Sequence, residues 1–321
     1  MALLSPEQLQ KWHDEGYLVI PGFFTSEETT EMLDRAHQLL NDFRIEGHPL
    51  VSSYRRKEAE LIVQTTFRTE EDGEHVGDEY FLNSGDKVSL GQASAFTAHH
   101  VELEIMATHG QIRYFLEPSS LSPATPTSPA KLLVPPAQSI NKIGHALATL
   151  DPVFRRYTLE NDRMTMLAKE LGEHTSPRVL QSMIICKQPK IVPCHNDSTF
   201  LYTDPPSAVG AWVALEECTA NNGCLSFLPG SHKSARVSSR FVRAQGGGTT
   251  FEDVPGVEPN AEKWDDLDGW VEAPCSPGTL VLIHGSVMHR SPPNPSDKSR
   301  VIYTFHMIEG AKGYVYDEKN W

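Results

Sequence analysis

The sequence predicts an all-β core with flanking helices, in which the N-terminal half of the chain is mostly helical. From residue 178 onward, short runs rich in β-branched and aromatic residues are separated by Gly, Pro and Asn turns. Before residue 178, helix-capping signals precede segments whose apolar residues recur at helical spacing. Helices and strands do not alternate as they do in βαβ units, so a sandwich or barrel is favoured.

Composition narrows the class of protein. The 321 residues, 39% hydrophobic and 22% charged, suffice for one large domain or two modest ones. A net charge of −14 argues against nucleic acid as a partner. The chain shows no 18-residue apolar stretch, so we expect no membrane insertion. Its first residues do not form a basic segment followed by an apolar one, so we do not expect secretion. Five cysteines without a Cys-x-x-Cys pair favour a reducing, cytoplasmic location.

The N-terminal elements are predicted from local signals. Ser5 and Gln8 form a capping box around Pro6, and Gly16 ends that helix before a strand at 17–20. Thr25 and Glu28 open a second helix in the same way, with apolar residues at helical spacing behind them.

Two further helices are expected, over residues 141–150 and 151–171, the second with Asp151 as N-cap. The strands of the core follow them at 179–185, 210–215, 224–228, 278–283, 287–291 and 300–306. Residues 246–270, rich in Gly, Pro and Asp, interrupt this series and are interpreted as a surface loop or lid.

The strongest chemical signal is His195-Asn196-Asp197. Residues i and i+2 of a strand project from the same face, so His195 and Asp197 can point at one spot. With one more imidazole they form a two-His-one-carboxylate triad, which leaves coordination positions open and suits non-haem Fe(II) oxygenases. The His-x-Asp pattern alone is common and needs structural context.

Three histidines compete for the third position, namely His232, His284 and His289. His289 stands eleven residues before Arg300, which begins a predicted strand on the far side of a Pro-rich turn. The two side chains can therefore be neighbours, and the planar guanidinium of Arg300 suits the carboxylate of a dicarboxylic cosubstrate.

With these residues in place, the chain resembles the phytanoyl-CoA dioxygenase family of Fe(II)/2-oxoglutarate oxygenases. The likeness extends almost end to end in blocks that keep one order: Leu4–Leu9, Ser139–Leu147, Asp151–Phe154, Cys186–Pro189, Asn222–Leu225, Pro229–His232, Leu282–Gly285 and Tyr303–His306. The resemblance implies a double-stranded β-helix, that is, a cupin-like jelly-roll, formed by a single domain over residues 1–321.

The resemblance also implies roles for individual residues. His195, Asp197 and His289 are the expected iron ligands, and Arg300 with Ser291 is expected to bind the far carboxylate of 2-oxoglutarate. Other positions expected to contact the cosubstrate are Lys142, Met183, Asn196 and Trp212, where Asn196 replaces the usual Gln.

The implied activity is hydroxylation of a small organic or acyl-type substrate, with O2 and 2-oxoglutarate consumed, succinate and CO2 released and ascorbate as a supporting reductant. The carboxylate of Asp197 favours hydroxylation, because related halogenating sites lack it. Two alternatives stay open: a non-catalytic jelly-roll protein that binds a metal or ligand, and a zinc hydrolase with His and Asp ligands.

One segment departs from the family pattern. Relatives join the equivalents of Gly85-Asp86-Lys87 and Ile112-Arg113-Tyr114 directly, whereas residues 88–111 intervene here. We interpret these 24 residues as an insertion, and hypothesise that they are a translated, unspliced intron. Retention of this segment in the major transcript would refute the intron hypothesis.

Overall fold

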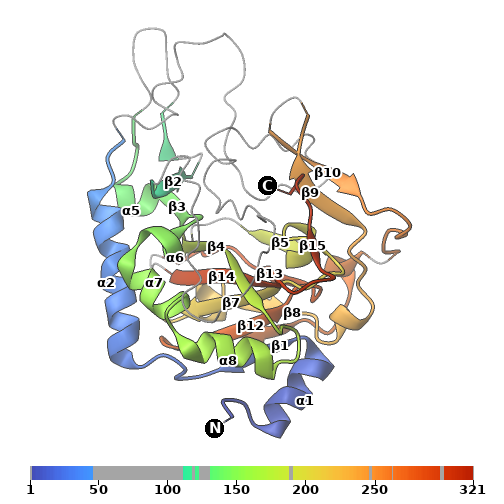
Figure 1. Cartoon of the computed structure of the whole chain (residues 1–321). Coiled ribbons are helices and arrows are strands. Elements are labelled where there is room, and N and C mark those ends of the chain that lie inside the picture. Colours follow the sequence, from blue (N-terminus) through green and yellow to red (C-terminus); the bar gives the residue numbers. More distant parts are fainter. Residues whose placement is uncertain are drawn as a thin grey trace.

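Two antiparallel sheets pack face to face, with helices on the outer face of the larger one (Figure 1). The computed structural model describes residues 2–45, 111–117, 120–122, 131–187, 191–245, 248–261, 263–296 and 300–320. Apart from Gln111, the predicted insertion at 88–111 lies outside these ranges. None of the helices in the described ranges has the length and apolar character needed to cross a bilayer.

The larger sheet has seven strands, and every neighbouring pair is antiparallel. From one edge to the other these are β1 (Tyr17–Ile20), β12 (Leu280–His284), β7 (Val209–Ala214), β14 (Val301–Glu309), β4 (Pro177–Cys186), β3 (Ile140–Gly144) and β2 (Arg113–Leu116). In the middle of the sheet, Thr304 is opposite both Met183 and Trp212. This register fixes which residues share the inner face.

The smaller sheet has four strands: β11 (Val271–Ala273), β8 (Leu225–Phe227), β13 (His289–Ser291) and β5 (Val192–His195). Two strand pairs flank it, β9 (Ser239–Arg243) with β10 (Thr249–Asp253) and β6 (Thr203–Asp204) with β15 (Val315–Tyr316). Four short 3-10 helices connect these strands: η4 (Asp197–Thr199), η5 (Ala220–Asn222), η6 (Ser231–Lys233) and η7 (Trp264–Asp266).

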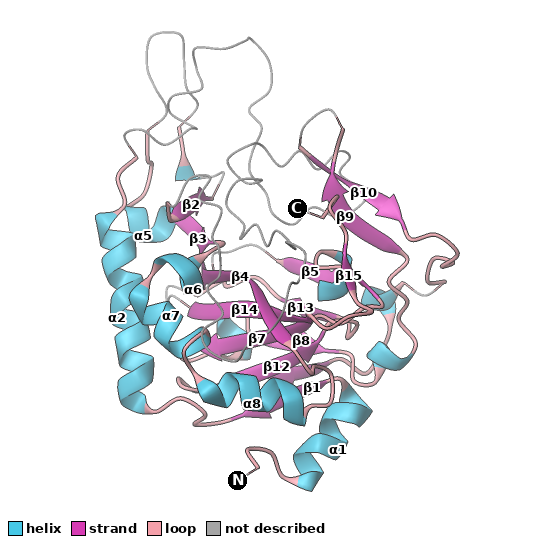
Figure 2. Cartoon of the chain, in the orientation of Figure 1, coloured by secondary structure: helices cyan, strands magenta, loops and turns pink. Residues whose placement is uncertain are grey.

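Among the described residues, most of the α-helices lie on one side of the sheets, whereas α1 (Pro6–Glu15) lies beside β1 at the bottom of the view (Figure 2). The others are α2 (Ser26–Asp42), α5 (Pro136–Ser139), α6 (Leu147–Leu150), α7 (Pro152–Thr158) and α8 (Asp162–Glu170). Both predicted capping boxes are present, at Ser5 and Thr25, and Gly16 ends α1 in the left-handed conformation. The structure thus confirms these local predictions. They could be made from the sequence because a cap depends only on residues a few positions apart.

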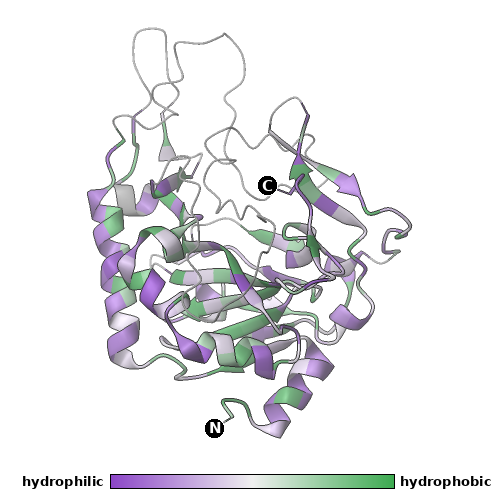
Figure 3. Cartoon of the chain, in the orientation of Figure 1, coloured by the Kyte–Doolittle hydropathy of each residue, from purple (hydrophilic) through white to green (hydrophobic). Residues whose placement is uncertain are grey.

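Alternation along β14 divides the core into two layers. Tyr303 and Phe305 face outward and pack with α7 and α8 in the cluster under the helices, whereas Ile302 packs between the two sheets. The central strands of the larger sheet are accordingly mostly hydrophobic, whereas the helices show mixed faces (Figure 3). Thr304 and His306 share the inner face with Ile302, so polar groups enter the space between the sheets.

Two helix predictions were wrong in part. Residues 141–150 are not one helix, because Ile140–Gly144 forms β3 and pairs with β4, with Lys142 opposite Ile185. Long-range pairing overrides local helix preference there. The helix predicted at 151–171 is interrupted, and Asn161 caps a second helix, α8, by accepting a hydrogen bond from the N–H of Arg163.

The segment 246–270 also differs from the expected loop. Thr249–Asp253 forms β10, and Phe251 packs against Phe241 of the neighbouring strand and against Phe200. A buried aromatic contact of this kind supplies the apolar surface that orders a strand. Its predicted role as a lid stays a prediction.

Candidate metal centre

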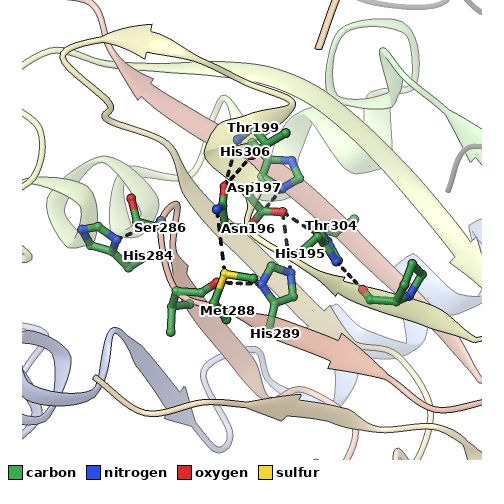
Figure 4. A network of polar contacts seen from close by, with 12 residues as sticks. His195, Asn196, Asp197, Thr199, His284, Ser286, Met288, His289, Thr304 and His306 are labelled. Carbon is green, nitrogen blue, oxygen red and sulfur yellow. Dashed lines mark hydrogen bonds and ion pairs between the residues drawn. The ribbon is translucent and has the colours of Figure 1, made fainter. Parts of the chain in front are cut away.

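Three of the predicted ligands converge between the sheets. His195 at the end of β5 and His289 at the start of β13 are direct cross-strand partners, and their ring centroids lie 4.2 Å apart. The Oδ1 atom of Asp197 lies 3.9 Å from Nε2 of His195 and 3.7 Å from Nε2 of His289. One donor atom from each of the three residues lies within 4.8 Å of the others. Figure 4 shows the three side chains pointing toward one another.

The backbone reaches this arrangement by a different route from the one predicted. β5 ends at His195, and Asp197 is the first residue of η4 rather than the next inward position of a strand. Asn196 between them keeps an extended conformation, and its side chain accepts a hydrogen bond from the N–H of Thr199. The carboxylate is therefore held by a capped turn that follows the strand.

Hydrogen bonds set the tautomer of both imidazoles. Nδ1 of His195 lies 2.8 Å from the carbonyl oxygen of Pro193, and Nδ1 of His289 lies 3.1 Å from that of Val287. A carbonyl only accepts, so Nδ1 carries the hydrogen in each ring and Nε2 presents a lone pair to the centre. Burial, followed by the effect of His289, lowers the pKa of His195 to about 4. A neutral imidazole is the form that binds a metal.

A third imidazole, that of His306, lies close to Oδ2 of Asp197, an oxygen that has no aligned hydrogen bond among the described residues. Nε2 of His306 lies 3.4 Å from Oδ2 of Asp197, and Nδ1 of His306 lies 3.3 Å from Nε2 of Gln181. Burial by itself raises the pKa of Asp197, but the neighbouring imidazoles of His306 and His289 lower it below its usual range. Gly210 makes room for this carboxylate, because a Cβ there would lie 3.0 Å from Oδ2.

The centre opens into a cavity of about 200 Å³ between the sheets. Except for Asn196, every predicted site residue lines it: Lys142, Met183, His195, Asp197, Trp212, His289, Ser291 and Arg300. These residues come from strands that are far apart in the sequence, and the two sheets bring them together.

Asn196 lies outside the cavity lining. Its Oδ1 accepts hydrogen bonds from the backbone and hydroxyl of Thr199, and its Nδ2 lies 3.8 Å from the sulfur of Met288. The side chain is buried and engaged in capping η4. The geometry gives no support to the prediction that it contacts a cosubstrate.

The two competing histidines lie apart from the centre. The rings of His232 and His284 are 4.9 Å from each other, and neither lines the cavity. Nδ1 of His284 accepts a hydrogen bond from the backbone of Ser286, and Nε2 of His232 lies 3.2 Å from the carbonyl oxygen of His13. Figure 4 shows His284 beside Ser286, apart from the group formed by His195, Asp197 and His289. Of the three candidates, the structure brings only His289 to the centre.

Arg300 provides a buried cation in the same cavity. It is 2% exposed, donates hydrogen bonds to the carbonyl oxygen of Gly223 and to Oγ of Ser291, and lies 5.5 Å from the ring centroid of Trp212. Its Nε has no hydrogen-bond partner, and no carboxylate forms a salt bridge with it, within the described part of the chain. Burial lowers the pKa of this guanidinium. A buried arginine without an acidic partner fits an anionic ligand.

The cavity also contains groups to which the sequence analysis gave no role at the site. The most notable is Lys187, which is 6% exposed and directly follows β4. It lies two residues after Ile185 and four after Met183, which also line the cavity, and this spacing was a signal that it faces inward. His145 was expected in a plain helix, but it follows β3 and lines the cavity too.

The sequence is similar to known proteins over its whole length. A model of the family "Phytanoyl-CoA dioxygenase (PhyH)" matches residues 12–302. Phytanoyl-CoA dioxygenase domain-containing protein 1 of Rattus norvegicus is 39% identical over 331 aligned positions, covering 100% of this chain and 95% of the rat protein. The phytanoyl-CoA dioxygenase of Arabidopsis thaliana is 35% identical over 322 positions, covering 99% of this chain and 93% of the plant protein.

Solved structures share the fold. The non-haem alpha ketoglutarate dependent epimerase SnoN from nogalamycin biosynthesis superposes with a TM-score of 0.55 at 14% identity, over 98% of this chain and 85% of that one. EctD from S. alaskensis, solved with bound Fe, gives a TM-score of 0.53 at 18% identity, over 96% of this chain and 78% of the EctD chain. The predicted jelly-roll fold is thereby confirmed. Because the family model spans most of its length and full-length relatives are 35–39% identical, this chain belongs to the phytanoyl-CoA dioxygenase family.

Proposed function

We propose that this protein is an Fe(II)- and 2-oxoglutarate-dependent dioxygenase that hydroxylates a small organic or acyl-type substrate. One observation carries the proposal: the triad of His195, Asp197 and His289 shares a cavity with a buried Arg300 that has no acidic partner among the described residues. Structures of SnoN with Fe3+ and alpha ketoglutarate, and of EctD with 2-oxoglutarate, support it by the likeness in fold.

The residues present fit the proposed groups. Two neutral imidazole nitrogens and one carboxylate oxygen are the donor set of a non-haem Fe(II) site with open positions. When bound, Fe(II) and 2-oxoglutarate supply O2 activation and the oxidative decarboxylation to succinate and CO2 that accompanies hydroxylation. The protein contributes binding and orientation.

The division of work among the side chains follows from their positions. His195, His289 and Asp197 would hold the metal, with His306 orienting the carboxylate. Arg300 and Ser291 would bind the far carboxylate of the cosubstrate. Further cavity-lining residues proposed to contact it are Lys142, Met183 and Trp212.

Two rival functions predict different behaviour. A zinc hydrolase with the same three ligands has no use for the buried charge of Arg300. A non-catalytic jelly-roll protein would bind the metal or the 2-oxo acid without turnover. The desolvation cost of a buried guanidinium favours a site that an anion completes, and so favours the oxygenase.

A cytoplasmic location is proposed together with this function. All five cysteines are free, and Cys186, Cys218, Cys224 and Cys275 are buried. Free thiols are the rule in the reducing cytosol, whereas extracellular proteins tend to pair them. Fractionation of cells that express the tagged protein tests this location.

The test is succinate release. Protein reconstituted with Fe(II), 2-oxoglutarate and ascorbate without O2 is expected to form succinate once O2 is admitted, even slowly and without substrate, and faster when a correct substrate from a screen is added. Asp197→Ala is expected to lose both iron and succinate formation. His232→Ala is the matched control, because it removes an imidazole outside the cavity. A wild-type protein that takes up iron and releases no succinate in the whole screen contradicts the proposal.

A further inference from the structure

Lys187 and Arg300 are placed side by side by the pairing of β4 with β14. Cys186 is opposite Val301, and one residue further on the N–H of Lys187 donates to the carbonyl oxygen of Arg300 at 3.1 Å. Residues directly opposite each other in an antiparallel ladder project from the same face. Both side chains therefore enter the cavity, at the end lined by Ser291.

This arrangement is unfavourable for the protein alone. Like charges at opposite positions repel, and both side chains are buried, with exposures of 6% for Lys187 and 2% for Arg300. Lys187 donates one hydrogen bond, from Nζ to the carbonyl oxygen of Ser291 at 3.3 Å. In the ranges that the structure describes, no carboxylate lies within salt-bridge distance of either cation. Glu117 also lines the cavity and acts on Lys187 from beyond that distance. The remaining compensating charge is then expected from a ligand.

Ser291 links the two cations. Its Oγ receives a hydrogen bond from Nη1 of Arg300 at 3.4 Å, while its carbonyl oxygen receives the one from Lys187. Burial and the neighbouring Arg300 lower the pKa of Lys187 to about 7, although Glu117 acts in the opposite direction. An anion bound between the two cations would restore the charged form of the lysine.

We propose that Lys187 is a second cationic contact for the far carboxylate of the bound 2-oxo acid, sharing with Arg300 the anion-binding end of the cavity. The inference rests on the proposed function and specifies its cosubstrate site further. The two side chains are complementary, because a guanidinium binds a carboxylate in a planar, two-point manner and an ammonium adds a compact charge from another direction.

This proposal and a purely structural role for Lys187 differ in the stability that they predict for a ligand-free Lys187 variant. Lys187→Met keeps the length of the side chain and removes a buried charge that faces another cation. Replacing a buried charge by an apolar side chain of similar volume is often neutral or stabilising. We therefore expect the ligand-free variant to have a Tm equal to or above that of the wild type. A structural lysine would give a lower one.

The binding test uses protein reconstituted with Mn(II), which occupies the site without turnover, and two acids. One is 2-oxoglutarate, and the other is 2-oxopentanoate, which has a methyl group in place of the far carboxylate. By calorimetry, Lys187→Met is expected to bind 2-oxoglutarate about ten- to a hundredfold more weakly, the worth of one charge-assisted hydrogen bond. Its affinity for 2-oxopentanoate should equal that of the wild type.

Two further variants complete the comparison. Lys187→Arg keeps the charge and should recover part of the lost affinity. Lys169→Met removes an exposed lysine at the end of α8 and should change neither affinity. In turnover, the KM for 2-oxoglutarate should rise in Lys187→Met, whereas kcat at saturation should stay close to that of the wild type.

The outcomes separate this inference from the function on which it rests. Unchanged 2-oxoglutarate affinity in Lys187→Met overturns the role of Lys187 alone. An equal loss of affinity for both acids, or a lower Tm, assigns the lysine to structure and also overturns it. A metal-loaded wild-type protein that binds neither acid overturns the inference and the proposed function together.

Discussion

At the scale of single residues, the candidate centre depends on one cross-strand pair and one turn. His289 and His195 face each other because β13 and β5 are in register there, and the capped turn at Asn196 brings Asp197 beside them. Nε2 of His306 lies 3.4 Å from the other carboxylate oxygen of Asp197, and Nε2 of Gln181 lies 3.3 Å from Nδ1 of that ring. Groups that orient a metal ligand commonly affect metal affinity as well.

His306 is therefore expected to act as a positioning residue. In His306→Phe the ring remains but the N–H that faces Asp197 is lost, and Fe(II) affinity should fall about ten- to a hundredfold. His306→Gln can still donate to the carboxylate and should recover part of this loss. Metal competition with a chromogenic chelator measures both. Wild-type affinity in His306→Phe would show that Asp197 is held without this contact.

The depressed pKa of Lys187 gives a pH-dependent prediction. Only the protonated lysine attracts a carboxylate, and a bound carboxylate raises its pKa above the ligand-free value of about 7. Affinity for 2-oxoglutarate should be highest below that pKa and fall as the pH rises, by at most about tenfold per pH unit. Burial also lowers the pKa of Lys142 to about 7. Since Lys142 is proposed to contact the same cosubstrate, it is expected to contribute a second such dependence.

Calorimetry across the pH range on both sides of neutrality tests this prediction. In Lys187→Met the decline in 2-oxoglutarate affinity should be shallower, and Lys142 should account for what remains. Arg300 stays charged throughout and adds no slope. Identical pH profiles in the wild type and Lys187→Met would contradict the assignment.

At the scale of elements, the sequence predicted helix caps correctly but did not predict every strand that depends on long-range pairing. The two capping boxes were predicted correctly, because Ser5 and Thr25 act on amides three residues away. The strand at Ile140–Gly144 was mistaken for a helix, because only its pairing with β4 and β2 makes it extended. A helix pattern is visible in a short window, whereas the partner of a strand is not.

The cap of α2 offers a test at this scale. Thr25→Ala removes the side chain that accepts from the N–H of Glu28, and should lower the free energy of unfolding by about 1 kcal/mol. Thr30→Ala, at an exposed position within the same helix, should change it by less than about 0.5 kcal/mol. Urea denaturation measures both. Because α2 packs outside the sheet, the KM for 2-oxoglutarate should be unchanged in each, and equal losses of stability would argue against the cap.

At the scale of the whole molecule, the cavity lies between the two sheets and takes residues from both. His195, His289 and Ser291 come from the smaller sheet, whereas Lys142 and Trp212 come from the larger one. A ligand that contacts both sheets binds the folded state and not the unfolded chain. Its binding free energy then adds to the stability of the fold.

Metal and cosubstrate should therefore stabilise the protein in succession. Mn(II) at a hundred times its Kd is expected to add about 2.7 kcal/mol, and 2-oxoglutarate at the same excess should add a similar amount on top. Thermal unfolding with each addition measures the two steps as increases in Tm. Asp197→Ala should lose the first step and, with it, the second. A metal step without any 2-oxoglutarate step would favour the zinc hydrolase.

The sequence alone determined the features that depend on near neighbours: the helix caps, the alternation of the core strands and the His-x-Asp motif at 195–197. The tertiary structure decided which distant residues meet. It selected His289 over His232 and His284, turned Asn196 away from the cavity and set Lys187 beside Arg300. The physical reason is that a cap forms within one turn of chain, whereas a strand finds its partner and register only when both sheets have buried their apolar faces.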